Sequence, residues 1–223
     1  MTMPKVIFLT AGTSWTLPID WNNNNNTIEA ISAGGGCAPY GGCGGNYVKI
    51  SNWKGSGVIS YAIGHGVSGA KGGNTWFNST GTLLAVGGNQ SGTAASTTGC
   101  VGTTIYSGGG GGSAGGGGAA GLNGVGGTTG GSSGGTADNG TVAAATNGTE
   151  WTATDTWNGT AYTGTQPTGG SGGGGNSGGA GAGSYGGGAG GTSSGPGANG
   201  IIVVTYVPIS SELTPQFMSF CFN

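Results

Sequence analysis

The stretch that decides the fold is Ile201-Ile202-Val203-Val204-Thr205-Tyr206-Val207, the strongest β-strand pattern in the chain. A continuous run of β-branched residues is typical of a strand that is central in a sheet or covered on both faces. Such a strand is not stable alone, because its apolar surface needs partner strands. The apolar segments available as partners lie within residues 5–86. We therefore expect 201–207 to return to a sheet built by the N-terminal part of the chain.

The N-terminal part, residues 1–107, contains short segments rich in β-branched and aromatic residues. They are 6–10, 14–17, 27–31, 47–50, 58–63, 75–77 and 82–86. Asn- and Gly-rich turn signals separate them, and strands at this spacing are typical of a β-sandwich rather than of βαβ units. No stretch repeats with a period of 3.6 residues, so little or no helix is expected. The predicted fold is all-β, with a sandwich of residues 1–107 closed by 200–208.

Glycine is concentrated between these two apolar parts. The chain has 223 residues and 60 glycines, and 38 of the glycines lie within 108–199. Glycine loses the most entropy on ordering and offers no side chain to bury, so this region could be a flexible linker. The alternative is polyglycine II, whose rods have three residues per turn and can hydrogen-bond side by side through their backbones. We expect packed polyglycine II rods, because apolar strands hold both ends of the region.

One segment inside the glycine-rich region, residues 141–166, has a different composition. Its Asn147-Gly148 and Asn158-Gly159 pairs favour type I′ turns and predict a three-stranded meander with 149–157 as the central strand. A period of two places three side chains of that strand on one face, and a two-residue loop adds a fourth opposite Asp155. The four are Trp151, Asp155, Trp157 and Tyr162.

Aromatic rings beside a carboxylate can hold carbohydrate or anchor a protein partner. These four residues are therefore the candidate receptor contacts. The alternative is that their face packs against the glycine rods or against another copy of the chain, because apolar faces of sheets are usually buried.

The charge composition limits the function classes. The chain has four lysines, no arginine, six carboxylates and a formal net charge of −2. Four lysines cannot neutralise a nucleic-acid backbone, and no run of about 18–20 apolar residues predicts insertion into a membrane. His65 lies between two glycines with no nucleophile that the sequence ties to it. We expect no catalytic residue and no cofactor, and the spacing of the four cysteines fits no metal site.

The cysteines and the C-terminal tail leave alternatives open. Cys37 and Cys43 could close a small disulfide, but the first residues lack the pattern of a signal peptide, which favours reduced thiols. The tail, residues 209–223, carries an apolar cluster. Its members are Phe217, Met218, Phe220 and Phe222. The tail is either a docking peptide for a partner or an oligomer, or a cover for an edge of its own sandwich.

The order of several sequence blocks resembles that of glycine-rich bacteriophage tail proteins. The blocks are Lys5–Pro18, Asp20–Asn22, Asn26–Ile31, Gly72–Asn78 and Gly197–Tyr206. The resemblance does not extend to the Thr- and Trp-rich meander or to the tail after Pro208. It implies a virion protein, assembled in the host cytoplasm, at or near the tip of a tail fibre. Such a protein associates with other tail proteins, commonly as a homotrimer, and contacts a host surface receptor without catalysis.

Other functions remain as alternatives to receptor binding. The chain could be a purely structural fibre, head or capsid decoration protein, with the glycine lattice as a rigid spacer. Ice binding would use flat arrays of small residues on the rods. Hydrolysis of a surface polysaccharide would need a converging pair of carboxylates, and the whole chain has only six.

Overall fold

The strand β12 (Ile201–Tyr206) lies at the centre of the fold, between β1 (Lys5–Leu9) and β3 (Asn26–Ile31). It pairs antiparallel with both strands, with Val204 opposite Ile7 on one side and opposite Ile28 on the other. The computed structural model describes residues 2–37, 39–90, 94–129, 131–164, 167–176, 182–191 and 195–209. The expected return of 201–207 to an N-terminal sheet is confirmed.

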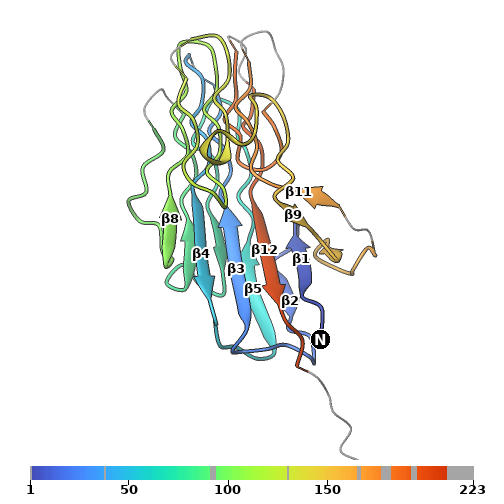
Figure 1. Cartoon of the computed structure of the whole chain (residues 1–223). Coiled ribbons are helices and arrows are strands. Elements are labelled where there is room, and N and C mark those ends of the chain that lie inside the picture. The colour runs from blue at the N-terminus through green and yellow to red at the C-terminus, as the bar shows by residue number, and fades with distance from the viewer. Residues whose placement is uncertain are drawn as a thin grey trace, which may run out of the picture.

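Two sheets face each other as a sandwich (Figure 1). The larger has the order β10-β1-β12-β3-β4-β8, which adds β4 (Tyr47–Ser51), β8 (Thr104–Tyr106) and β10 (Asp155–Trp157). The smaller has the order β2-β5-β6-β7, with β2 (Ser14–Thr16), β5 (Val58–Ala62), β6 (Thr75–Phe77) and β7 (Leu83–Ala85). A separate pair joins β9 (Trp151–Thr152) to β11 (Thr168–Gly169). In the described residues the helical structure is a single 3₁₀ turn, Asp138–Gly140, so the all-β prediction is confirmed.

The run of apolar residues in β12 is explained by two cores, one on each face of the larger sheet. Ile202 and Val204 pack between the sheets with residues such as Trp15 and Phe77. Ile201 and Val203 point to the opposite face. There they pack with Phe8, Ile31, Tyr47, Ala119, Ala120, Trp151 and Ala153. Because β12 is covered on both faces, both alternate sets of its side chains are apolar.

The glycine-rich segments form a bundle that extends from one end of the sandwich, at the top of Figure 1. The segments are 32–37, 41–46, 64–73, 86–89, 108–121, 126–129, 131–137, 171–176, 182–191 and 195–200. Three consecutive amides, of Gly116, Gly117 and Gly118, donate to carbonyls of three different segments, at Gly175, Gly42 and Gly127 respectively. Residues three apart share a neighbouring segment: Gly41 and Gly44 both donate into 108–121, and Gly42 and Gly45 both donate into 182–191. This three-residue period is the one expected of polyglycine II.

The spacing of the segments explains why glycine is needed. A Cβ atom built on Gly44 would lie 1.9 Å from the carbonyl oxygen of Gly118, and one built on Gly117 would lie 2.0 Å from that of Gly109. No side chain fits at such distances, so the backbones approach only because the side chains are missing. The backbone hydrogen bonds of the bundle take the place of an apolar core.

The bundle contains segments from both sides of the expected boundary between 1–107 and 108–199. Segments 32–37 and 41–46 lie inside it, where Gly42 accepts from Gly117 and Gly44 donates to Gly109. The connections between sandwich strands, such as the one between β3 and β4, run out into the bundle and back. The two regions are therefore interleaved rather than one being inserted into the other.

The three-stranded meander expected over 141–166 is not formed by the residues of that range that the structure describes. β10 joins the larger sheet parallel to β1, with Ile7 opposite Asp155, and β9 pairs with β11. At the second Asn-Gly pair, Trp157 bridges to Tyr162 rather than to Thr160, so the loop is two residues longer than expected. The physical reason is the open edge of β1, whose unpaired backbone groups take β10 as a partner.

The tail beyond Ile209 lies outside the described residues, and so does its apolar cluster. Within the described part of the chain, no helix has the length and apolar character needed to cross a membrane.

Candidate functional site

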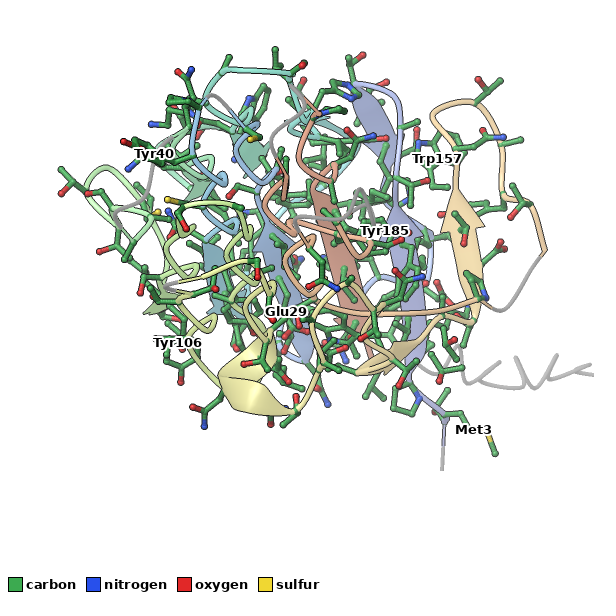
Figure 2. The ribbon with its side chains drawn as sticks, turned by 90° about the horizontal axis from the view of Figure 1, so that it is seen from above. Met3, Glu29, Tyr40, Tyr106, Trp157 and Tyr185 are labelled. Carbon is green, nitrogen blue, oxygen red and sulfur yellow. The ribbon has the colours of Figure 1, made fainter. Side chains whose placement is uncertain are left out.

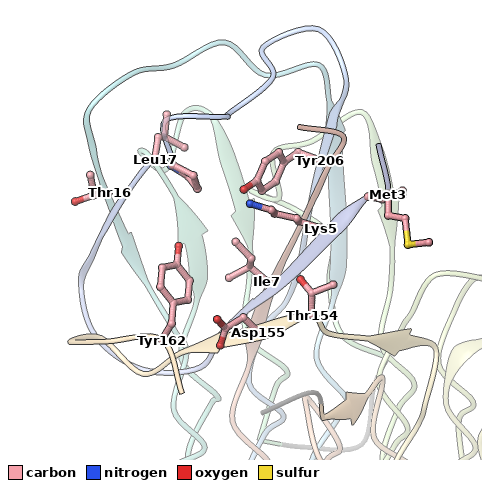
Figure 3. Close-up of a pocket in the computed structure, with 11 residues that line it drawn as sticks. Met3, Lys5, Ile7, Thr16, Leu17, Thr154, Asp155, Tyr162 and Tyr206 are labelled. Atoms are coloured by element: carbon pink, nitrogen blue, oxygen red, sulfur yellow. The ribbon is translucent and has the colours of Figure 1, made fainter. Parts of the chain in front are cut away.

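A pocket of about 700 Å³ opens at the edge of the sandwich, where β1 and β10 of the larger sheet face β2 of the smaller one (Figure 3). Its lining residues are Met3, Pro4, Lys5, Ile7, Thr16, Leu17, Pro18, Thr154, Asp155, Tyr162 and Tyr206. Most of its walls are apolar, and a few charged and hydroxyl groups converge on it. A volume of this size is in the range of small-ligand pockets.

Local strand geometry positions the polar groups of the pocket. Alternation along β1 places Lys5 on the same side as Ile7, facing the smaller sheet. The parallel pairing of β10 brings Asp155 beside Ile7, and the loop after β10 returns Tyr162 next to Trp157. In Figure 3 the side chains of Lys5, Leu17 and Tyr162 point toward one shared space.

The Lys5 ammonium is held by a hydrogen-bond network at the mouth of the pocket. Lys5 Nζ lies 2.6 Å from Asp20 Oδ2, and Tyr206 Oη donates to Asp20 Oδ1 at 3.0 Å. Desolvation raises the pKa of Asp20, but the hydrogen bonds from Lys5 and Tyr206 outweigh it and leave the pKa below its ordinary value. Burial, together with the charge of Asp20, raises the pKa of Tyr206. At neutral pH the mouth of the pocket therefore carries the paired ammonium of Lys5 and carboxylate of Asp20 beside the neutral phenol of Tyr206.

Tyr162 is the exposed aromatic of the pocket. Its side chain is 42 % exposed, and its ring meets that of Trp157 edge to face at 5.2 Å between centroids. The Trp15 indole N–H donates to Tyr162 Oη at 2.7 Å, which fixes the direction of the ring. Partial burial raises the pKa of Tyr162, so its hydroxyl is protonated at neutral pH and can donate to a ligand.

Asp155 has a structural task as well as a place in the pocket. Its Oδ1 accepts from the backbone N–H of Gly164 at 2.9 Å and from that of Thr156 at 2.7 Å. Asn158 Oδ1 accepts from the N–H groups of Thr160 and Ala161, which closes the turn. These bonds hold the loop that carries Tyr162.

The four sequence candidates are separated by the structure. Asp155 and Tyr162 line the pocket, whereas Trp157 is half-buried against the core between the sheets, with its indole N–H donating to the Ser14 carbonyl. Trp151 is only 7 % exposed and packs on the opposite face of the larger sheet. The expected common face of Trp151 and Trp157 is therefore wrong. The chain is irregular between β9 and β10, so the period of two does not continue from one tryptophan to the other.

Sequence reasoning did not identify Lys5, Leu17 and Tyr206 as site residues. They come from β1, the turn after β2, and β12, which are far apart in the sequence. No local motif links them. Only the pairing of β12 with β1, which puts Tyr206 opposite Lys5, brings two of them together.

Glu29 is a second titratable group of note, and it is buried under Trp151. Tyr47 Oη donates to Glu29 Oε1 at 2.5 Å and the Trp151 indole N–H donates to Oε2 at 3.1 Å. Desolvation raises the pKa of Glu29, although these two hydrogen bonds and the charge of Lys49 oppose the rise. The carboxyl fastens β9 onto β3, which is a structural role.

The other candidate ligand groups form no site in the described part of the chain. No three His, Cys, Asp or Glu side chains there are grouped so that they could hold a metal ion. The Cys37 thiol donates to the Gly191 carbonyl at 2.5 Å, and burial raises its pKa. Cys37 is thus a thiol, and the disulfide that its spacing from Cys43 would allow is not formed.

No protein-family model matches the chain, and no curated protein is significantly similar to it. The resemblance to phage tail proteins accordingly rests on the sequence blocks alone.

Proposed function

We propose that the chain is a non-enzymatic phage virion protein at the tail or fibre tip that recognises a host surface receptor through the pocket beside β10. The observation that carries this proposal is the convergence of the exposed Tyr162 ring, the Asp155 carboxylate and the Lys5 ammonium on an open pocket with apolar walls. An apolar wall suits the C–H face of a sugar ring, and the charged groups suit its hydroxyls. A carbohydrate or another outer-membrane component is therefore the proposed receptor.

The rigidity of the site supports binding. Asp155 lies on a strand, and the Tyr162 hydroxyl is fixed by Trp15, so little order has to be gained when a ligand enters. The two carboxylates near the pocket, Asp20 and Asp155, also already accept hydrogen bonds from groups of the protein. Asp20 pairs with Lys5 and Tyr206, and Asp155 holds backbone amides, which favours a binding site over an acid–base pair.

Association with other tail proteins and a homotrimeric state are part of the same proposal, and they rest on the resemblance. Analytical ultracentrifugation of the purified chain tests the oligomeric state. A mass near three times the 21.0 kDa of the chain is expected. A monomer at micromolar concentration would contradict the trimer.

The receptor proposal is tested by binding of the purified protein to susceptible cells and to extracted lipopolysaccharide. Tyr162→Ala is expected to weaken binding by about tenfold or more, as the loss of an aromatic anchor does. Tyr162→Phe keeps the ring and should retain most of the affinity. Tyr40→Ala is the matched control, because Tyr40 is also exposed but lies in the glycine bundle, well away from Trp157 in Figure 2.

Two results would contradict the proposal. Unchanged binding by Tyr162→Ala, with loss of binding by Tyr40→Ala, would move the receptor contact to the bundle. Absence of any cell binding, together with normal adsorption of virions that lack the protein, would favour the second candidate, a structural virion protein. The observation behind that candidate is the bundle itself, whose backbone bonds in three directions make a stiff spacer.

A further inference from the structure

The end of the sandwich opposite the glycine bundle exposes a group of large apolar side chains. Ile19 is 101 % exposed and Met3 is 84 % exposed, and Val58 and Ile209 are also more than half exposed. We call these four residues the apolar rim. They come from the N-terminal segment, the β2–β3 loop, the start of β5 and the segment after β12, all at the lower end in Figure 1.

The apolar rim is continuous with the pocket described above. Met3 lines the pocket, and Ile19 follows the lining residue Pro18. Val58 is in register with Thr16, another lining residue. The Ile209 backbone N–H donates to the Asp20 carbonyl at 3.0 Å, beside Ile19. The four side chains therefore surround one end of the sandwich next to an apolar pocket, a place where an apolar segment can be buried.

We propose that the C-terminal segment of the same chain, residues 210–223, covers the apolar rim and places its aromatic side chains in the pocket. The segment starts on the rim itself, because the last described residue before it is Ile209. Phe217 is eight residues further on, which allows a reach of up to about 26–29 Å. The end of the segment is apolar, with three phenylalanines and a methionine in its last seven residues.

Covalent connection favours the segment of the same chain over other occupants. A short connection gives an effective concentration in the millimolar range, well above that of a copy free in solution at micromolar concentration. For a second copy held within the proposed trimer, the mass of the crosslinked product decides between the two. This inference does not depend on the proposed receptor. If both hold, a receptor must displace the segment, so the segment and the receptor compete for one pocket.

The experiment uses the full chain with p-benzoylphenylalanine in place of Phe220. Irradiation of the purified protein, followed by digestion and mass spectrometry, maps where the segment lies. Crosslinks to peptides that contain Met3 or Leu17 are expected, in a product that runs at the monomer mass of about 21.0 kDa on a denaturing gel.

Two exposed positions provide a matched pair of variants in the same crosslinking chain. Ile19→Glu places a charge on the rim and should lower the yield of these crosslinks at least severalfold. Val125→Glu places the same charge on an exposed apolar residue between two bundle segments and should leave the yield unchanged. Because both side chains are exposed, neither variant is expected to unfold the protein.

Three outcomes would overturn the inference. Crosslinks confined to the glycine bundle, or no crosslinks at all, would mean that the segment does not cover the rim. Crosslinks to Met3 or Leu17 in a product of twice the monomer mass would assign the pocket to the segment of a second copy. Cell binding has no part in this readout, so a failed receptor proposal and a failed segment proposal are distinguishable.

Discussion

At the scale of single residues, the buried carboxyl of Glu29 is a group whose negative charge destabilises the fold. Burial raises its pKa above the ordinary value of about 4.3 even though Tyr47 and Trp151 donate hydrogen bonds to it. The folded state therefore binds this proton more tightly than the unfolded state does. The stability that Glu29 contributes is fully present below the unfolded pKa and is lost as the pH rises through the folded pKa.

We predict that Glu29→Gln removes this part of the pH dependence. The amide is neutral at all pH values, and it can still accept from Trp151 and donate to Tyr47. Between pH 4 and pH 8 the free energy of unfolding of the variant should fall less steeply than that of the natural chain, measured by urea denaturation. A variant with the same slope as the natural chain would show that Glu29 is not the group responsible.

At the scale of elements, β12 supports both cores, and its truncation should be costly. Ile202→Ala removes a fully buried side chain between the sheets and is expected to lower the free energy of unfolding by about 2–5 kcal/mol. Ile19→Ala shortens an isoleucine that is fully exposed and should change stability by less than about 0.5 kcal/mol. Urea denaturation of the two variants measures the difference. Equal effects would contradict a central, doubly covered β12.

The edge strand β10 depends on a small number of polar contacts with β1. Thr154 Oγ1 accepts from the Val6 N–H at 3.0 Å and donates to the Val6 carbonyl at 2.9 Å. Thr154→Val keeps the shape and removes both bonds, so we predict a loss of about 1–3 kcal/mol. Hydrogen exchange should report faster exchange in β10 than in β12 for this variant. Unchanged protection in β10 would mean that the main-chain pairing alone holds the strand.

At the scale of the whole molecule, stability is divided between an apolar sandwich and a bundle held by backbone hydrogen bonds. Gly44→Ala puts a Cβ within 1.9 Å of the Gly118 carbonyl, so neighbouring segments must separate. We predict a cost of at least about 1–3 kcal/mol and a clearly lower melting temperature. Gly131→Ala is the control, because nothing lies within 4 Å of its Cβ position. Equal melting temperatures for the two variants would contradict close packing of the bundle.

Much of the architecture followed from the sequence, and the reason is local chemistry. The apolar run 201–207 required strands on both sides, and the short β-rich segments of 1–107 required a sandwich. Glycine at high density allowed backbones to pack in a three-residue period. In each case the residue type determines the local conformation or the burial that it needs.

The candidate site was predicted only in part. Asp155 and Tyr162 were identified because they flank an Asn-Gly turn, a local signal. Their partners Lys5, Leu17 and Tyr206, and the burial of Trp151, depend on how distant segments meet. β10 pairs parallel with the open edge of β1, so it is not available for the expected meander. The sequence alone determined the all-β class and the polyglycine II rods, because residue type sets local conformation. The tertiary structure decided the pocket and the interleaving of bundle and sandwich, because pairing between distant strands leaves no trace in local periodicity.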